Sequence, residues 1–417
     1  MLLSGREFDD FDEASGIPVA MVGCELIPSW LSDMNRVSAN ASLIYYVRMI
    51  RPAPVALALI ACFLPAFGEH TLSTRAYSYV GGKYTGDPAH EVMAGQMYVE
   101  VLRPQRVVQK YPLVFFHGAG QTGTNWMGTP DGRAGWADYF LQQGYVIYLV
   151  DQPARGRSPW HPSVNGPLQM RPPDWVSQRF TAPEIAHIWP QSRKHTQWPG
   201  SGDKKGRQGD PVFDAFYATQ VEGLESAVET QTLIQAAGAA LLDKIGPAIL
   251  VTHSQSGAFG WLLADARPKA VKAIVAMEPA GPPFHDAVFD EDKNRVWGLT
   301  DIPITYAPPV KSPTELAIVQ EAKADGPDLA RCWSQADPSR RLVNLQGIPV
   351  AVVTGEASYH APYDHCTSKF LAQAGVANTH LRLEEQGIHG NGHMLMIEKN
   401  SLEIAALLQK WITGNVK

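Results

Sequence analysis

The sequence predicts an α/β fold in which a mostly parallel, doubly wound sheet carries inserted cap segments. Three continuous apolar runs, 111–116, 145–151 and 247–253, have the length and composition of strands buried on both faces. A helical pattern at 134–143 separates the first two runs, and such alternation indicates parallel strands joined by right-handed crossovers. With 417 residues and 45% apolar content, the chain can bury a large core. We therefore expect one large domain with insertions.

The expected core begins near residue 71 with two short alternating segments, 76–80 and 96–102, which predict an antiparallel pair. Strand and helix alternation is lost over 159–218 and again over 284–345, and we interpret both stretches as cap insertions. The first insertion is rich in tryptophan and proline, so it is expected to line a pocket with aromatic surface.

The second half of the chain completes the sheet. We expect a helix at 221–244, then strands at 273–278, 349–354 and 380–383, and a closing helix at 401–414. The first of these strands ends on a carboxylate, Glu278, and the last leads into a loop that contains two histidines, His389 and His393.

The start of the chain does not follow this pattern. Residues 49–68 look like a signal peptide, because Arg51 precedes an apolar stretch that is short for a membrane span and ends in small residues. The alternative for this segment is a buried helix or a membrane anchor. Residues 1–48 are then an extension, or a start assigned too early. Leader removal predicts a mature domain over 69–417 with no stable membrane span, in a secreted or periplasmic protein.

Charge and cysteine content limit the partners and cofactors. The formal charge of −6, with no concentrated Lys/Arg stripe, argues against a nucleic-acid partner and favours a small-molecule one. The oligomeric state is left open, a homodimer included. Cys24 and Cys62 would be lost at or before the leader, and Cys332 with Cys366 form either a disulfide or two buried thiols. No CxxC motif or His/Cys cluster indicates a metal, and no cofactor motif is present.

The third buried run is followed by the clearest chemical signal. It breaks into a turn at Ser254 and continues as a helix over 258–264. A serine on such a strained turn has its hydroxyl lifted off the strand end, and its neighbours must be small where the helix crosses the next strand. Ser256 and Gly257 meet this requirement. Thr252 stands where the usual motif has glycine, so the pentapeptide alone is a degenerate match.

A glycine-rich turn, 117–123, follows the first buried run. At the carboxyl end of a strand, such a turn lets backbone N–H groups face an open site, where they stabilise negative charge on a carbonyl oxygen. The expected donors of this oxyanion hole are the N–H of Ala119 or Gly120 and the N–H of Gln255.

The chain order of serine, acid and histidine is that of a nucleophilic triad. A serine hydroxyl needs a neutral imidazole to take its proton, and a carboxylate must orient that imidazole. His393 is favoured over His389 because the apolar run 394–396 behind it can dock the loop. The acid remains open on this reasoning, because Glu278 follows one strand while Glu356 and Asp364 follow the next.

Several short motifs occur together in a specific order. They are His117-Gly118, Gln121-Thr122-Gly123, Thr129-Pro130-Asp131-Gly132-Arg133, Gly135-Trp136, Asp151-Gln152, Arg155-Gly156-Arg157-Ser158, His253-Ser254-Gln255-Ser256-Gly257, Glu278-Pro279 and Gly390-Asn391-Gly392-His393-Met394. From about residue 71 onward the chain resembles a small group of secreted bacterial esterases in the α/β-hydrolase superfamily. The resemblance implies the α/β-hydrolase fold and a triad acid at the end of the sixth strand, which is Glu278 here. This chain has Ala119-Gly120 where the group's pattern can carry two adjacent cysteines.

These observations favour a serine hydrolase that cleaves carboxylic esters through an acyl-enzyme. In this hypothesis Ser254 attacks, His393 transfers the proton, Glu278 orients the imidazole, and Ala119 and Gln255 bind the oxyanion. A lactonase or an acyltransferase would use the same triad. A catalytically silent binding protein on the same fold is the alternative of a different class. The sequence does not indicate which acyl or alcohol groups are accepted.

Overall fold

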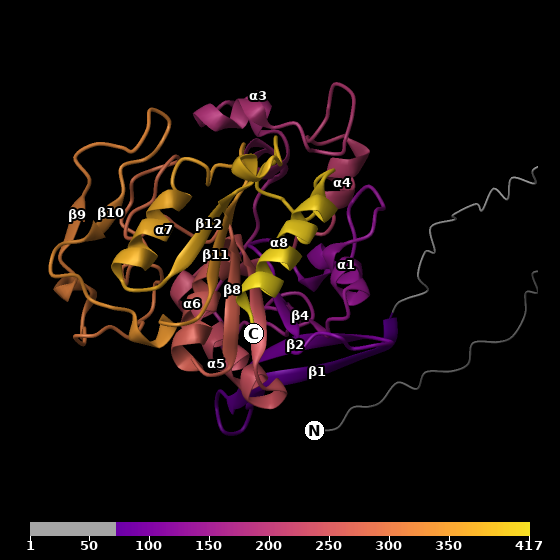
Figure 1. Ribbon diagram of the computed structural model, residues 1–417. Helices are drawn as coiled ribbons and strands as arrows, with labels where there is room; N and C mark the ends of the chain where they lie inside the picture. The colour runs from indigo at the N-terminus through magenta and orange to yellow at the C-terminus, as the bar shows by residue number, and fades with distance from the viewer. Residues whose placement is uncertain (1–71) are drawn as a thin grey trace, which may run out of the picture. The chain divides into compact units, whose positions relative to one another are not determined.

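The computed structural model describes residues 72–417, so the predicted extension and leader segment lie outside the described residues. An eight-stranded, mostly parallel sheet forms the centre of this part of the chain (Figure 1), which confirms the predicted fold class. In spatial order its strands are β1 (Leu72–Thr85), β2 (Val92–Pro104), β4 (Ile147–Asp151), β3 (Leu113–Phe116), β7 (Ala248–His253), β8 (Val271–Met277), β11 (Val350–Thr354) and β12 (Asn378–Arg382).

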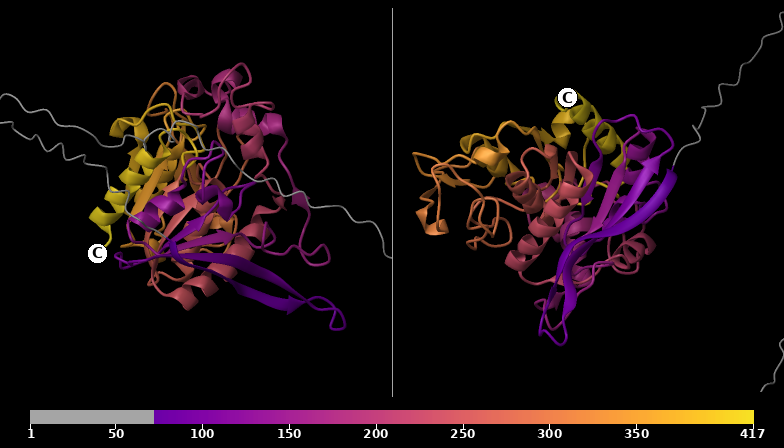
Figure 2. Two further views of the ribbon diagram at one scale, coloured as in Figure 1. Left: turned by 90° about the vertical axis from the view of Figure 1, so that its right-hand side faces the viewer. Right: turned by 90° about the horizontal axis from the view of Figure 1, so that it is seen from below.

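The first two strands form the antiparallel pair that the sequence predicts, but each is longer than expected. β1 and β2 make a long ribbon at one edge of the sheet, and part of it projects beyond the helices (Figure 2). Because much of β1 is exposed on both faces, its outer residues lack the alternation that marks a half-buried strand. This explains why only its middle was recognised.

The six strands from β4 to β12 are parallel to one another. Every residue of β3 is buried, and the side chains alternate between two hydrophobic cores, with Val114 and Phe116 in one and Leu113 and Phe115 in the other. A continuous apolar run is therefore what a strand with helices on both faces requires.

Helices cover both faces of the sheet. α5 (Ala227–Ile245) and α6 (Gly257–Ala266) pack in the first core, and α1 (Trp136–Gln142) and α8 (Ser401–Asn415) pack in the second. Figure 2 shows α5 and α8 on opposite sides of the sheet. Since each face of the sheet buries its own apolar surface, the parallel strands are shielded from water on both sides.

Two expectations about helices were wrong. The helix predicted from residue 221 begins at Ala227, because Ser226 caps it by accepting a hydrogen bond from the Glu229 N–H. The residues before the cap instead form β6 (Gly223–Leu224), paired with β5 (Leu168–Gln169). A helix that the sequence analysis did not anticipate, α7 (Asp364–Gln373), connects β11 to β12. Its first residues are buried polar ones, so it lacks a clear apolar stripe.

Two long stretches leave the sheet, between β4 and α5 and between β8 and β11, and they include the insertions predicted at 159–218 and 284–345. The first stretch contains α2 (Pro173–Val176), α3 (Pro183–Ala186) and α4 (Pro211–Tyr217) together with the β5–β6 pair, and the second contains β9 (Ile318–Gln320) and β10 (Trp333–Gln335). Among the described residues, none of the helices has the length and apolar character needed to cross a membrane.

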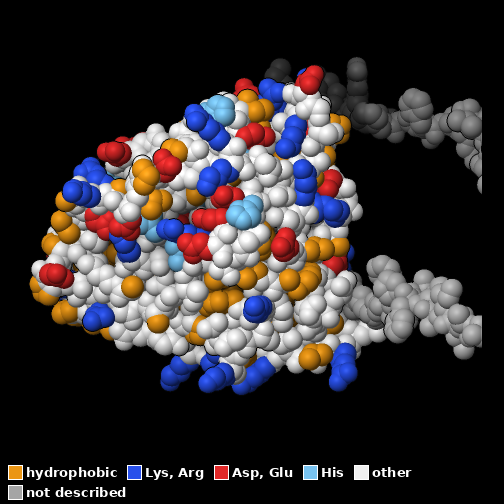
Figure 3. Space-filling view, turned by 45° about the horizontal axis from the view of Figure 1, so that its top comes forward, with side chains coloured by type: hydrophobic (Ala, Val, Ile, Leu, Met, Phe, Trp, Pro, Cys, Tyr) orange, Lys and Arg blue, Asp and Glu red, His pale blue; other side chains and the backbone are white. Residues whose placement is uncertain are grey.

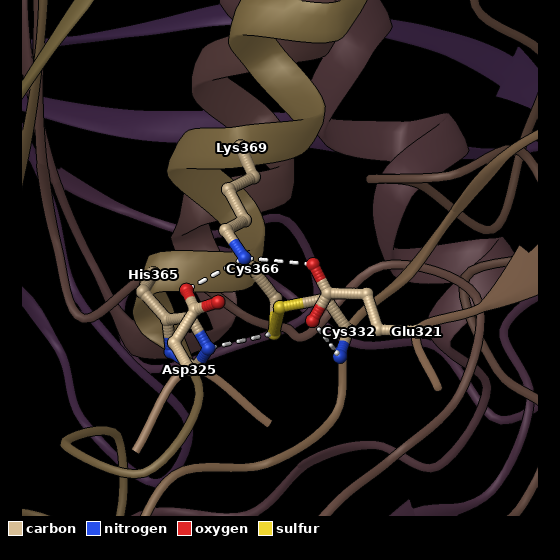
Figure 4. Close-up of a disulfide and its surroundings, with 6 residues drawn as sticks. All are labelled: Glu321, Asp325, Cys332, His365, Cys366 and Lys369. Carbon is tan, nitrogen blue, oxygen red and sulfur yellow. Dashed lines mark hydrogen bonds and ion pairs between the residues drawn. A yellow bond between two sulfur atoms is a disulfide. The ribbon is translucent and has the colours of Figure 1, made fainter. Parts of the chain in front are cut away.

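Cys332 and Cys366, whose state the sequence left open, are joined by a disulfide. The bond ties the second inserted stretch, next to β10, to the first turn of α7. Figure 4 shows Lys369 beside it, paired with Glu321 and Asp325. Both sulfur-bearing residues are buried, so the bridge holds the inserted stretch against the sheet domain.

We predict that the double variant Cys332→Ala/Cys366→Ala loses about 3–4 kcal/mol of unfolding free energy, since the bridge closes a loop with a sequence separation of 34 residues. Denaturant unfolding of oxidised protein would measure this loss. Wild-type protein unfolded with a reductant should match the variant. Alkylation of both residues in denatured, unreduced wild-type protein would contradict the bridge.

Candidate active site

Ser254 lies directly after β7, in a backbone conformation that few residues with a side chain adopt. Its φ is +57°, in the left-handed region, which is strained for a residue other than glycine. Hydrogen bonds hold the turn: the His253 N–H donates to Ser256 Oγ at 2.7 Å, and that hydroxyl donates to the Phe116 carbonyl at 2.8 Å. The Ala280 N–H donates to the Ser254 carbonyl at 2.8 Å. Hydrogen bonds to the neighbouring strands therefore hold Ser254 in this strained conformation.

The residue that starts α6 has to be glycine. A Cβ atom on Gly257 would lie 2.4 Å from Cβ of Pro279, which follows β8 in the adjacent part of the sheet. Any side chain would push the elbow away from that strand end. The requirement for a small residue, expected from the sequence, therefore has a specific steric cause.

Glu278 follows β8 and contacts His393 from the late loop. The His393 Nδ1 and Glu278 Oε2 atoms are 2.5 Å apart, and both side chains are buried. The carboxylate also accepts hydrogen bonds from the Gly355 N–H at 2.8 Å and from the Ser358 hydroxyl at 2.7 Å. Three donors thus fix Glu278, and Glu278 in turn fixes the orientation of the imidazole.

Burial controls the protonation of this pair. Desolvation raises the pKa of Glu278 well above its usual range, and the nearby Asp364 carboxylate adds to the effect, while the bonds from Ser358 and Gly355 oppose it. Desolvation also lowers the pKa of His393 well below its usual value, and the neighbouring His253 and His360 act in the same direction. The imidazole is therefore neutral at neutral pH, as a general base must be.

The alternative residues have other partners. His389 is largely exposed, and its Nδ1 lies 3.2 Å from the Glu356 carboxylate. Asp364 accepts a hydrogen bond from Thr354 and pairs with His360 at 2.9 Å. Of the three carboxylates that the sequence left open, only Glu278 is hydrogen-bonded to His393 in the described structure.

Two further residues at the site were not assigned a role from the sequence. The Tyr359 hydroxyl lies 3.3 Å from His393 Nε2, and Tyr359 lines the same cavity as Ser254. Burial raises the pKa of Tyr359, so the phenol stays protonated. His253 donates through Nε2 to the His393 carbonyl at 2.9 Å, and burial lowers its pKa to about 3. The signal for Tyr359 was its place in a polar run, 358–360, shortly after a predicted strand end.

The glycine-rich turn after β3 approaches the elbow closely. A Cβ on Gly118 would lie 3.1 Å from Cβ of Ser254. Arg155 joins the two loops, because its Nη1 donates to the Gly118 carbonyl and to Gln255 Oε1, each at 3.1 Å. Burial lowers the pKa of Arg155 to about 10, and its side chain remains charged at neutral pH. Arg155 thus ties the glycine-rich turn that contains Ala119 to Gln255, the residue after the serine.

Two cavities meet at the elbow. The larger, of about 310 Å³, is lined by Ser254 and Gln255 together with aromatic residues of both inserted stretches, including Trp175 and Phe289. The smaller, of about 110 Å³, is lined by Ala119 and Gln255 and again by Trp175. The serine therefore opens onto a space that both inserted stretches help to enclose.

Potential metal ligands gather at two places in the described part of the chain: His253, Glu278 and His393, and Cys332, His365 and Cys366. In the first group, the hydrogen bond between Glu278 and His393 and the bond from His253 to a carbonyl already use ligand atoms. In the second, the two sulfur atoms are bonded to each other. Neither group offers three free ligands.

The loop that carries His393 rests on a buried ion network. His195 lies 2.6 Å from a Glu184 oxygen through Nδ1 and 2.9 Å from a Glu398 oxygen through Nε2. Glu398 also accepts the Gly392 N–H at 2.9 Å. Burial disfavours a charged imidazole, but the hydrogen bonds to Glu184 and Glu398 outweigh it and raise the pKa of His195 to about 9. A protonated histidine thus connects the first inserted stretch to the His393 loop.

Comparison with known proteins agrees with this architecture. A family model described as alpha/beta hydrolase fold matches residues 111–327. The chain belongs to the α/β-hydrolase family. This α/β hydrolase is 47% identical over 338 residues to a fungal protein named probable secreted lipase phiG, a match that covers 81% of this chain and 89% of that protein.

A solved structure described as a novel bacterial esterase has a TM-score of 0.56 and 25% identity, and the match covers 84% of this chain and 98% of that one. These similarities identify the chain as a lipase- and esterase-like α/β hydrolase.

We predict that stability falls as pH rises through the pKa of His195. Its folded pKa of about 9 exceeds the ordinary 6.5, so its contribution is complete below about pH 6.5 and is lost as pH rises through about 9. The change should reach roughly 3 kcal/mol. Unfolding free energies measured across this range should show the decline in wild type and not in His195→Gln. Equal slopes in the two proteins would contradict the role of His195.

Proposed function

We propose that this α/β hydrolase is a secreted serine esterase that cleaves carboxylic esters through an acyl-enzyme. The observation that carries the proposal is the buried Glu278–His393 pair, whose Nε2 lies 3.3 Å from the hydroxyl of Tyr359, a residue that lines the same cavity as the strained Ser254. Each group stands at the carboxyl end of the parallel sheet or in the loop beside it, where ligands of open α/β sheets bind.

In the proposed mechanism, neutral His393 removes the hydroxyl proton of Ser254 as Oγ forms a bond to the ester carbonyl carbon. Glu278 stabilises the resulting imidazolium, and the N–H groups of Ala119 and Gln255 stabilise the oxyanion. When the carbon–oxygen bond to the alcohol breaks, the imidazolium gives its proton to the leaving alkoxide. Water then attacks the acyl carbon while His393 removes a proton from the water. His393 returns that proton to Ser254 Oγ as the acyl–oxygen bond breaks, which releases the acid.

The alternatives differ in how far they depart from this proposal. A catalytically silent binding protein would have no use for a serine held at a positive φ beside an oriented, neutral imidazole. A lactonase or an acyltransferase would share every step up to the acyl-enzyme and differ only in the ring or in the accepting alcohol. The name of the fungal relative supports secretion and a lipid-like or ester substrate, and the leader-like segment 49–68 fits that location.

We predict that Glu278→Gln folds normally but loses roughly a thousandfold or more in kcat, because an amide cannot stabilise the imidazolium. Ser254→Ala should lose at least as much, and wild type should acquire the acyl mass on Ser254 when quenched during turnover of an activated ester. Glu356→Gln, a carboxylate outside the pair, is the matched control and should stay near wild type. Near-normal turnover by Glu278→Gln with collapse of the control would move the acid to Glu356.

We predict that the acid limb of kcat/KM lies below pH 6.5. Only the neutral imidazole acts as the base, and burial lowers the pKa of His393 below that ordinary value, so activity should rise with pH at the acid end and level off before neutrality. Initial rates from about pH 4 to about pH 8, with circular dichroism at each pH to exclude unfolding, would test it. A midpoint above pH 6.5 would contradict this assignment.

A further inference from the structure

Arg179 is held between two aromatic rings at the larger cavity. Its guanidinium carbon lies 4.3 Å from the Trp175 ring centroid and 4.3 Å from the Phe289 ring centroid. Trp175 belongs to the first inserted stretch and Phe289 to the second, and all three residues line the cavity that contains Ser254. Contact with two aromatic rings restricts the orientation of the planar guanidinium.

Arg179 has no carboxylate partner in the described structure, unlike two other partly or fully buried arginines. Within residues 72–417 no carboxylate pairs with Arg179, its Nη1 reaches the Trp175 carbonyl only at 3.5 Å, and its buried Nε has no acceptor. By contrast, Arg157 pairs with Asp151 and Arg295 pairs with Asp286. Guanidinium has five donors, and buried donors are normally satisfied. Most of the hydrogen-bonding capacity of Arg179 therefore remains available to a ligand.

Three carboxylates also line the cavity, and each already has donors. Asp286 is paired with Arg295, Asp301 accepts from the Gln231 amide at 2.6 Å, and Asp290 accepts a backbone N–H at 3.1 Å. Figure 3 shows acidic and basic side chains mixed over the upper and middle part of the drawn face, with basic side chains along its lower edge. A preference for substrates of one charge must therefore come from the position of Arg179 in the cavity and not from the overall electrostatic potential of the protein surface.

The rings that contact Arg179 lie near the proposed reacting groups. The Phe289 ring centroid is 5.3 Å from that of Tyr359, and the Tyr359 hydroxyl is 3.3 Å from His393 Nε2. These contacts connect Arg179 to His393 through two aromatic side chains, Phe289 and Tyr359, and Arg179 lines the same cavity as Ser254. A substrate that reaches both Arg179 and Ser254 must therefore fit between them inside that cavity.

We propose that Arg179 binds a carboxylate carried by the substrate, so that the enzyme prefers esters whose acid or alcohol part ends in an anionic group. This inference rests on the proposed esterase function and adds the substrate class. A carboxylate would accept two parallel N–H bonds from the guanidinium, in the bidentate geometry that arginine favours. It would also neutralise the one cation of the cavity that has no carboxylate partner among the described residues.

The main comparison uses esters that share a three-methylene acyl chain and differ in the group at its end. Monoethyl glutarate carries the anion on the acid side, ethyl 4-nitrobutanoate is its neutral isostere, and ethyl 4-(trimethylammonio)butanoate is its cationic counterpart. 4-Acetoxybutanoate places the anion on the alcohol side. Proton release at constant pH gives kcat/KM for each ester. We expect at least one anionic ester to exceed the neutral isostere by about tenfold or more, which is the scale of a charge-assisted hydrogen bond.

Substitutions of Arg179 would test whether this residue causes the preference for anionic esters. In Arg179→Met the ratio of kcat/KM for the anionic ester to that for the neutral ester should fall about tenfold or more, and Arg179→Lys should restore it in part. Arg193→Met is the matched control, because Arg193 is an exposed arginine of the same inserted stretch that lines neither cavity. The control should leave the ratio unchanged.

The outcomes separate this inference from the esterase function itself. Hydrolysis of the neutral ester with no anionic preference, or with preference for the cationic ester, would overturn the role of Arg179 and leave the esterase function intact. If no ester is hydrolysed, calorimetric titration of glutarate into Ser254→Ala and into Ser254→Ala/Arg179→Met still decides. Binding that is lost in the double variant supports the site, and equal or absent binding in both rejects it.

Discussion

The left-handed backbone at Ser254 is the constraint on which the rest of the site depends. A serine at φ +57° is costly unless the surrounding structure imposes that conformation. Here the adjacent strands do so through Ser256 and the Ala280 N–H, and Gly257 permits the close crossing against Pro279. The elbow is therefore stable only inside a completed parallel sheet, which explains why the whole fold is needed to expose one hydroxyl.

Buried charges surround this elbow, and most of them are arranged in fully bonded groups. Glu278 has three donors, and His195 connects Glu184 and Glu398 beneath the His393 loop. Such networks position groups well because a misplaced member would leave a buried charge unpaired. Arg179 differs from them in having no carboxylate partner among the described residues, and this is why it carries the inference about the substrate.

Much of the fold could be predicted from the pattern of apolar residues. Strands such as β3 are buried on both faces and appear in the sequence as unbroken apolar runs. Prediction failed where polar contacts replaced that pattern. α7 begins with buried polar residues, and α5 begins at Ala227 because a serine cap, which hydrophobic periodicity does not reveal, ends the preceding segment.

By itself the sequence determined the sheet class, the serine elbow, the glycine-rich turn and the late histidine, because each depends on residues that are neighbours in the chain. The resemblance implied Glu278 as the acid, but local patterns did not separate it from Glu356 and Asp364, and the contact with His393 is a property of the tertiary structure. The tertiary structure alone decided that Cys332 and Cys366 are bridged and that Tyr359 and Arg179 line the same cavity as Ser254. These contacts join residues far apart in sequence at the carboxyl edge of the sheet. Their pairing depends on strand order and on how the inserted stretches fold back, and local patterns contain neither.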